Sequence, residues 1–214
     1  MVEFKHIGKV STSMVFNRRP CEAEMTIVIV GVPRGGTTMV AAVVDSLGID
    51  LGPREELNKF HFEDQTMNQP HPKQRHEYIT KRNSEHPIWG WKDPIGIVPL
   101  QEMIFALRNP RVIVVSRDTL ASIQGEMRFD KVNEVAHPKT LPDLVEQTMQ
   151  WQEQNWKFVL RTTVPTLLVS YERALVDRKL FLHELSGFLG MNLRPEQLNT
   201  AMDCISPTGG YIQP

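Results

Sequence analysis

Four short apolar runs are separated by longer, more polar stretches along the chain. They lie at residues 26–31 (TIVIVG), 87–91 (PIWGW), 111–116 (RVIVVS) and 166–170 (TLLVS). Each run is rich in β-branched or aromatic residues and is shorter than an ordinary helix, which is typical of strands buried on both faces. The runs therefore predict four strands of a central parallel sheet.

Helical periodicity fills most of the segments between these runs. Apolar residues recur at helical spacing from Met39 to Leu47, and Gly48 then provides a natural C-terminal stop. Further helices are expected at 72–82 and 99–106, after Asp118, from Thr140 to about 161, at 179–189 and after Pro195. The alternation predicts an α/β fold: a three-layer α/β/α arrangement, P-loop-like, in a single domain over residues 1–214.

Two polar stretches, 50–86 and 128–140, interrupt this alternation. The first contains three prolines with little clear periodicity apart from its one expected helix, and the second combines charges with His137 and Pro138. Long excursions in α/β domains often carry substrate contacts. We therefore expect both stretches on the acceptor side of a site.

Composition and charge narrow the classes of partner. The 214 residues carry 24 Lys and Arg against 25 Asp and Glu, which argues against a general nucleic-acid binder. Two cysteines cannot form a disulfide framework, and without a CxxC motif or clustered histidines we expect no metal site. Neither a run of about 18 apolar residues nor a leader-like apolar block is present, so we expect a cytoplasmic protein without a membrane span.

The first predicted strand leads through GVPRGGTT into a predicted helix, and this is the context of a phosphate-binding loop. Unpaired N–H groups at a helix N-terminus attract anions, aided by the helix dipole. Gly31 and Gly36 have the separation of a Walker A loop, but Thr37 stands at the position of its lysine and the cation lies at Arg34. The loop therefore predicts binding of a single phosphate, although a tight turn without any ligand remains an alternative.

The loop GVPRGGTT resembles the 5′-phosphosulfate loop of the sulfotransferases that use PAPS (3′-phosphoadenosine 5′-phosphosulfate). A second element is similar to that family's 3′-phosphate motif: the strand RVIVVS runs into Arg117, and Ser122 follows on the next helix, about 80 residues after the loop. Two shorter segments, GWKDP at 90–94 and the pair Tyr171-Glu172, are also similar to family elements. The resemblance covers residues 26 to 190.

The resemblance implies a role for each matching residue. Arg34 and Lys92 would bracket the transferred sulfuryl group and the bridging oxygen, while Arg117 and Ser122 would hold the 3′-phosphate. The 5′-phosphate would be held by the loop and first helical turn, through Gly35, Gly36, Thr37 and Thr38. No metal is required by this chemistry.

This chain departs from the family pattern at three points. Arg34 replaces the loop lysine of the cytosolic members. Gly125 stands eight residues after Arg117, where the family has a serine, so the pair Arg108 and Ser116 is a second candidate for the 3′-phosphate. The family's closing segment near the C-terminus is missing, and residues 209–211 (GGY) are a possible reduced substitute.

An acceptor hydroxyl also needs a general base within hydrogen-bond reach. Some members of the family use a glutamate about 21 residues after the loop arginine, and that count leads to Glu55. His61 is the chief rival because imidazole titrates near neutral pH. Glu56 and Glu63 are further candidates.

The resulting hypothesis is transfer of a sulfuryl group from PAPS to the hydroxyl or amine of a small or terminal-group acceptor, with release of 3′,5′-ADP. The acceptor and the oligomeric state are not encoded in any pattern that we recognise. Two other functions remain open: a nucleotide kinase with a degenerate P-loop, and an inactive nucleotide-binding protein of the same fold.

Overall fold

The structure is a computed structural model that describes residues 10–59, 61–67 and 72–206. A five-stranded sheet with the order β1-β5-β4-β2-β3 forms its centre. The four predicted strands are confirmed as β2 (Met25–Val30), β3 (Ile88–Lys92), β4 (Arg111–Ser116) and β5 (Thr166–Ser170), and they are parallel to one another. The predicted α/β fold class is therefore confirmed.

The sheet is mixed rather than wholly parallel, which corrects the expectation. Strand β1 (Ser13–Phe16) pairs antiparallel with β5 at one edge of the sheet. It was not predicted because only four residues, SMVF, form it and only Ser13 among them is buried. Such an edge strand lacks the apolar run by which the central strands were found.

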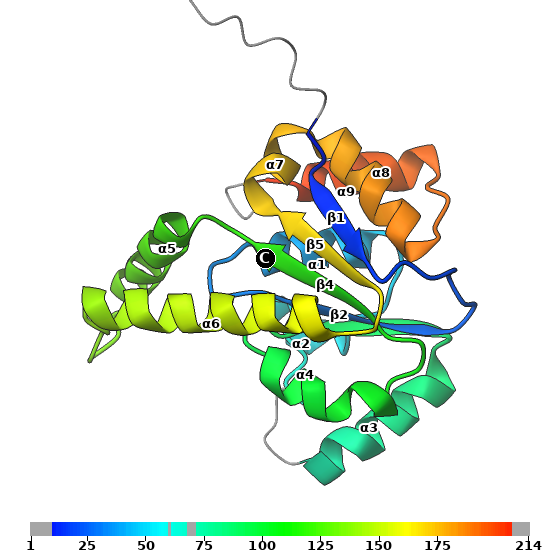
Figure 1. Cartoon of the computed structure of the whole chain (residues 1–214), viewed down its shortest axis with the longest axis horizontal. Helices are drawn as coiled ribbons and strands as arrows, with labels where there is room; N and C mark the ends of the chain where they lie inside the picture. The colour runs from blue at the N-terminus through cyan, green and yellow to red at the C-terminus, as the bar shows by residue number, and fades with distance from the viewer. Residues whose placement is uncertain (1–9, 60, 68–71, 207–214) are drawn as a thin grey trace, which may run out of the picture.

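Helices cover both faces of the sheet (Figure 1). The elements are α1 (Thr37–Ser46), α2 (Arg54–Lys59), α3 (Pro72–Glu85), α4 (Ile97–Met103), η1 (Ile104–Ala106), α5 (Thr119–Val132), α6 (Leu141–Arg161), α7 (Tyr171–Val176), α8 (Arg178–Leu189) and α9 (Pro195–Cys204). Helix α6 begins with a capping box, in which Thr140 and Asp143 satisfy each other's backbone N–H groups. None of the helices in the described ranges is long and apolar enough to cross a membrane.

Alternation along the central strands builds two apolar layers. Ile27 and Ile29 of β2 point into a cluster with α1, α8 and α9, while Val28 and Val30 point into the opposite cluster with α4 and α6. Burial on both faces explains why these strands are continuously apolar. The prediction of one domain over 1–214 stays a prediction, since no observation tests it.

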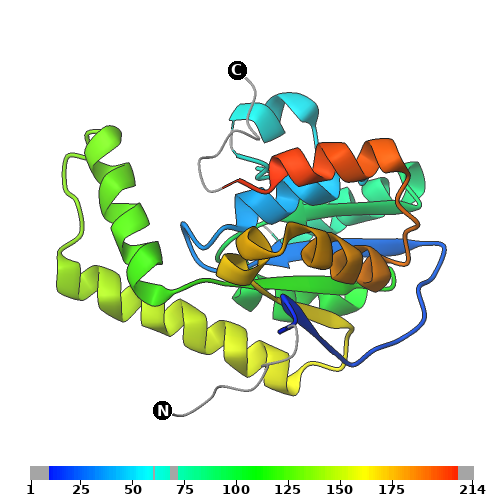
Figure 2. The same ribbon diagram turned by 90° about the horizontal axis from the view of Figure 1, so that it is seen from above.

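The helical boundaries differ from expectation in the two excursions. The 50–86 stretch contains α2 as well as the expected helix, and α5 continues to Val132, so residues 128–132 are helical rather than part of a loop. Figure 2 shows α5 and the first half of α6 extending beyond the sheet as a helical hairpin, which we call the α5–α6 arm. The stretch 128–140, expected from its charges and Pro138 to be a loop, is therefore helical at its start.

Candidate functional site

The predicted phosphate loop lies at the carboxyl end of a central strand. It follows β2, which is flanked by β3 on one side and β4 on the other, so the chain reverses its direction of winding at this strand. Ligands of open α/β sheets bind in the crevice at such a point. Because the carboxyl ends of parallel strands share one edge, Lys92 at the end of β3 and Arg117 after β4 come close to the loop.

The loop presents its helix N-terminus without a side-chain cap. Gly36 is the N-cap residue of α1, and its φ of 88° lies in the left-handed region that favours glycine. A Cβ at this position would also lie 2.1 Å from the ring of Tyr171. No side chain caps the helix here, so the N–H groups of the first turn are available to an anion.

Arg34 is held by the α5–α6 arm. Its guanidinium lies 3.5 Å from the centre of the Phe129 ring, and its Nε donates to Oε2 of Glu126 at 3.3 Å. A Cβ on Gly125 would lie 2.9 Å from the Cβ of Arg34. The loop cation is therefore fixed by three residues from consecutive turns of α5.

Lys92 is a buried cation beside the first turn of α1. It is 1% exposed, and its Nζ lies 3.0 Å from Oγ1 of Thr38 and 3.0 Å from Oε1 of Glu63. Burial lowers the pKa of Lys92 from its usual value, while the adjacent Glu63 carboxylate opposes that shift. The pairing of β2 with β3 sets this geometry, because Ile29 and Lys92 are register partners.

Arg117 ties the end of β4 to the loop. One of its terminal nitrogens donates to the carbonyl of Arg34 at 2.6 Å, and its guanidinium lies 4.6 Å from the centre of the Tyr171 ring. Its Nε lies 4.0 Å from a carboxylate oxygen of Glu172. The pair Tyr171-Glu172, at the start of α7, thus lies next to Arg117.

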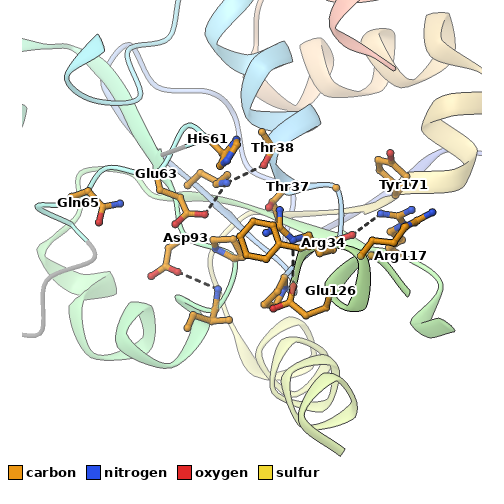
Figure 3. A pocket seen from close by; sticks show the side chains of 18 residues that line it. Arg34, Thr37, Thr38, His61, Glu63, Gln65, Asp93, Arg117, Glu126 and Tyr171 are labelled. Atoms are coloured by element: carbon orange, nitrogen blue, oxygen red, sulfur yellow. Dashed lines mark hydrogen bonds and ion pairs between the residues drawn. The ribbon is translucent and has the colours of Figure 1, made fainter. Parts of the chain in front are cut away.

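These residues surround one cavity of about 780 Å³ (Figure 3). Arg117 and Tyr171 lie at one end of it, and Glu63, Gln65 and Asp93 lie at the other. Of the predicted site residues, the cavity is lined by Arg34, Gly36, Thr37, Thr38, Lys92 and Arg117, together with the rival bases His61 and Glu63. Gly35 is in the loop, but its N–H donates to the carbonyl of Val32 at 2.9 Å.

Other predicted residues are not brought to the cavity. Ser122 is 1% exposed, and its hydroxyl donates to the carbonyl of Asp118 within its own helix, at 3.1 Å. Glu55 is exposed on α2 and is not among the lining residues. The Glu56 side chain and residues 209–211 lie outside what the structure describes.

The second candidate for the 3′-phosphate is also separated. Arg108 donates to the carbonyls of Asn83, His86 and Pro87, at the amino ends of the strands. Ser116 ends β4 at the opposite edge of the sheet. Arg108 and Ser116 therefore cannot clamp one phosphate.

His61 and Asp93 line the cavity near Lys92. Burial lowers the pKa of His61 from its usual value, and the positive charges of Lys92 and Arg34 lower it further. Burial raises the pKa of Asp93, whose Oδ1 accepts the N–H of Ile95 at 3.1 Å. His61 is therefore predominantly neutral at neutral pH, as a proton acceptor must be.

Glu126, Phe129 and Asp93 are site residues that the sequence reasoning missed. Gly125, Glu126 and Phe129 share one helix face by their spacing, so a helix assigned through Val132 would have brought them together. Asp93 directly follows Lys92 and could have been noted from that alone. Within the described residues, no group of three His, Cys, Asp or Glu side chains is placed to hold a metal ion.

No protein-family model matches the sequence, and no curated protein sequence matches it. Solved structures do match its fold. The sulfotransferase domain from the curacin biosynthetic pathway is 16% identical, with a TM-score of 0.58 over 85% of this chain and 78% of that one. The sulfotransferase STF9 from Mycobacterium avium is 14% identical, with a TM-score of 0.59 over 86% of this chain and 68% of that one. A mouse sulfotransferase complexed with PAP is 13% identical, with a TM-score of 0.58 over 87% of this chain and 65% of that one. The chain therefore has the fold of the PAPS-dependent sulfotransferases.

Proposed function

We propose that this chain transfers a sulfuryl group from PAPS to a hydroxyl or amine of an acceptor and releases 3′,5′-ADP. The observation that carries the proposal is the position of Lys92. Its buried ammonium lies beside Thr38, in the first turn of α1. The loop before that turn lacks the Walker lysine, so Lys92 brings a cation to it from β3. A second cation, Arg34, lines the same cavity.

The residues of the cavity fit a nucleotide that carries phosphates at two positions. The uncapped N-terminus of α1, with Thr37 and Thr38, suits the 5′-phosphate. Arg117 suits the 3′-phosphate, and it acts without Ser122, whose hydroxyl is bonded inside α5. The half-buried guanidinium of Arg117 is held over the Tyr171 ring, 4.6 Å from its centre, where it can donate to an anion.

PAPS supplies an activated sulfuryl group, and the side chains stabilise the charge that its transfer creates. A lone pair of the acceptor oxygen or nitrogen forms the new bond to sulfur as the bond between sulfur and the bridging oxygen breaks. That electron pair stays on the 5′-phosphate oxygen of the departing 3′,5′-ADP. Lys92 and Arg34 are fixed cations where this charge develops, which is the largest catalytic effect expected.

His61 is our choice for the base that takes the proton of the acceptor. It lines the cavity and is predominantly neutral at neutral pH, whereas the carboxylate of Glu63 is engaged by Lys92 at 3.0 Å. Glu63 then keeps Lys92 charged and oriented. Glu55, the base suggested by the residue count, is exposed on α2 outside the cavity lining.

The proposal is tested first by nucleotide binding. The melting temperature is measured with 3′,5′-ADP and with 5′-AMP, and we expect a clearly larger rise with 3′,5′-ADP because only it engages Arg117 through a 3′-phosphate. Equal shifts with the two nucleotides would remove the proposal. Stabilisation by ATP with Mg²⁺ alone would favour the kinase instead.

Transfer itself is tested with PAPS labelled in the sulfuryl group. Panels of phenols, sugars, amines and peptides are incubated with the protein, and labelled products are separated from PAPS. Label transfer that disappears in the Lys92→Met variant supports the proposal. Binding of 3′,5′-ADP with no transfer to any acceptor would instead indicate a nucleotide-binding protein that has lost turnover.

A further inference from the structure

One face of α6 exposes a stripe of large apolar side chains. Leu141 is 53% exposed, Met149 58%, Trp156 46% and Leu160 75%. Val145 lies among them and is half-buried. Their spacing of mostly four residues, with one seven-residue step, places them along one side of the helix over its whole length. We call these five residues the α6 stripe.

The α6 stripe lies beside the face by which α6 joins the domain. Leu144, Thr148, Asn155, Phe158 and Val159 are the buried residues of the helix. Asn155 donates to the carbonyl of Gly31 at 2.6 Å, so this buried face supports the phosphate loop. Contiguous exposed apolar surface of this kind marks an interaction site more often than chance.

We propose that the α6 stripe is the interface of a homodimer, in which α6 packs antiparallel against α6 of a second copy. The positions of the stripe are nearly symmetric about a centre between residues 150 and 151. In an antiparallel pair, Leu141 therefore faces Leu160 of the partner, and Val145 faces Trp156 of the partner. The two copies of Met149 meet near the centre, as a two-fold axis requires.

The charges beside the stripe favour the antiparallel arrangement. Glu146 flanks its first half and Lys157 flanks its second half, on the same side of the helix. Antiparallel packing places Glu146 of each copy opposite Lys157 of the other, which gives two attractive pairs. In parallel packing this flank of one copy and that of the other would lie on opposite sides of the contact, so neither of these pairs could form.

The same charges argue for a protein partner rather than a membrane surface. A helix that lies in a membrane interface carries Lys and Arg along its polar side. Here the flank contains Glu146, Glu153 and Lys157, and the last two already form an ion pair at 2.9 Å. A flank with both signs of charge suits a self-complementary contact.

The shape of the molecule allows the contact. The α5–α6 arm carries the first half of α6 beyond the sheet, so this half can reach the second half of α6 in the other copy (Figure 2). Helix α6 has 21 residues, which corresponds to a contact roughly 30 Å long at 1.5 Å per residue. Two α5–α6 arms would then lie side by side across the two-fold axis.

The experiment measures mass in solution by light scattering after gel filtration, with the full chain at increasing concentration. We expect twice the 24.5 kDa of one chain at high micromolar concentration. Met149→Glu should leave only the single-chain mass. Val176→Glu, which alters an 87% exposed valine on α7, is the matched control and should keep the dimer.

Charge exchange tests the register of the pairing. Glu146→Lys and Lys157→Glu each place like charges opposite one another twice, so each variant alone should dimerise at least about a hundredfold more weakly. An equal mixture of the two variants should dimerise again, because every facing pair is then of opposite charge. Circular dichroism checks that each variant is folded.

Three outcomes would overturn the proposal. The first is a wild-type chain that keeps the single-chain mass at every concentration. The second is a dimer that survives Met149→Glu, which would mean another interface. The third is a mixture of the charge variants that stays monomeric, which would exclude the antiparallel register.

Discussion

Gly125 lies directly against Arg34: a Cβ built on Gly125 would be 2.9 Å from the Cβ of Arg34. This contact explains why residue 125 is a glycine, whereas the sulfotransferases that the chain resembles carry a serine at the corresponding position. The space is taken by the loop arginine, which has a φ of 55° and extends its side chain along α5 to Phe129. The arginine in the loop and the glycine in α5 therefore go together.

The variant Gly125→Ala tests this dependence. The added methyl group displaces Arg34 from Glu126 and Phe129, and misplacing a catalytic cation by about 1 Å costs about a hundredfold in rate. We expect kcat to fall 10- to 100-fold, by that reasoning. Initial rates of sulfuryl transfer at saturating PAPS measure the effect.

Gly187→Ala is the matched control for that variant. Gly187 also lies inside a helix, α8, but a Cβ there would meet no atom within 4 Å. This change should leave the rate unchanged and raise the free energy of unfolding by about 0.5–1 kcal/mol. A rate for Gly125→Ala equal to that of Gly187→Ala would show that Arg34 does not depend on the contact.

Replacing Lys92 by methionine removes the buried cation beside Thr38 while keeping an unbranched side chain. Loss of a fixed charge at the departing oxygen should lower kcat about a hundredfold or more. Affinity for 3′,5′-ADP should change much less, because Arg117 and the α1 N-terminus remain. Rapid-quench or steady-state kinetics separate the two effects.

Lys73→Met is the control for the loss of one positive charge. Lys73 lies on α3 with a 90% exposed side chain, 4.0 Å from Glu77. Its replacement should leave kcat within twofold of wild type, in keeping with the small contribution of exposed pairs. If both lysine variants retained full activity, Lys92 would have no part in the chemistry.

The choice of His61 as base predicts a specific pH dependence. Burial and the charges of Lys92 and Arg34 hold the pKa of His61 below 6.5, so the imidazole is neutral above that pH and gains a proton as the pH falls. The rate should therefore be flat near neutrality and fall on the acidic side with a midpoint below 6.5. His61→Asn should lower the rate about 100-fold or more and abolish this midpoint.

His76→Asn, on the exposed side of α3, should keep the wild-type profile. Glu63→Gln separates the two rival bases, since it should alter Lys92 rather than remove the proton acceptor. If Glu63→Gln lacked the acidic midpoint of the pH–rate profile while His61→Asn retained it, Glu63 rather than His61 would be the base.

Local patterns allowed the central strands, the phosphate loop and its helix to be predicted. The TIVIVG run and the glycines after it determine their own conformation, so Thr37 and Thr38 were placed correctly on the first turn of α1. The ion pair of Lys92 with Glu63 depends on how β3 aligns with β2 and with the excursion, and no local pattern specifies that alignment. Side-chain partners across elements therefore required the structure.

Two residues assigned to the site from sequence do not line the cavity, for a related reason. Counting residues from Arg34 led to Glu55, but a count says nothing about the path of the chain between α1 and β3. His61 and Phe62 have φ values of 55° and 67°, and these left-handed residues turn the chain so that His61 reaches the cavity. Ser122 had the right residue type, but its hydroxyl donates to its own helix.

The last prediction concerns stability. Glu184 on α8 accepts the hydroxyls of Ser11, Thr12 and Ser13 at 2.5–2.7 Å and the N–H of Thr12 at 3.1 Å, so one carboxylate attaches the edge strand to the helical layer. Glu184→Ala leaves these donors without their charged acceptor, and we expect a loss of about 1–3 kcal/mol, measured by urea unfolding. Glu77→Ala, on an exposed pair, should cost less than about 0.5 kcal/mol.

The pH dependence of that loss identifies the carboxylate as its source. Burial alone would raise the pKa of Glu184, but the hydroxyls of Ser11, Thr12 and Ser13 outweigh it and leave the pKa below 4.5. A carboxylate with a lowered pKa in the folded state contributes stability that is complete above pH 4.5 and disappears as the pH falls through the folded-state value. The difference between wild type and Glu184→Ala should therefore be constant at neutral pH and shrink in acid. A difference that does not change with pH would mean that packing, rather than the charge of Glu184, holds β1 to α8.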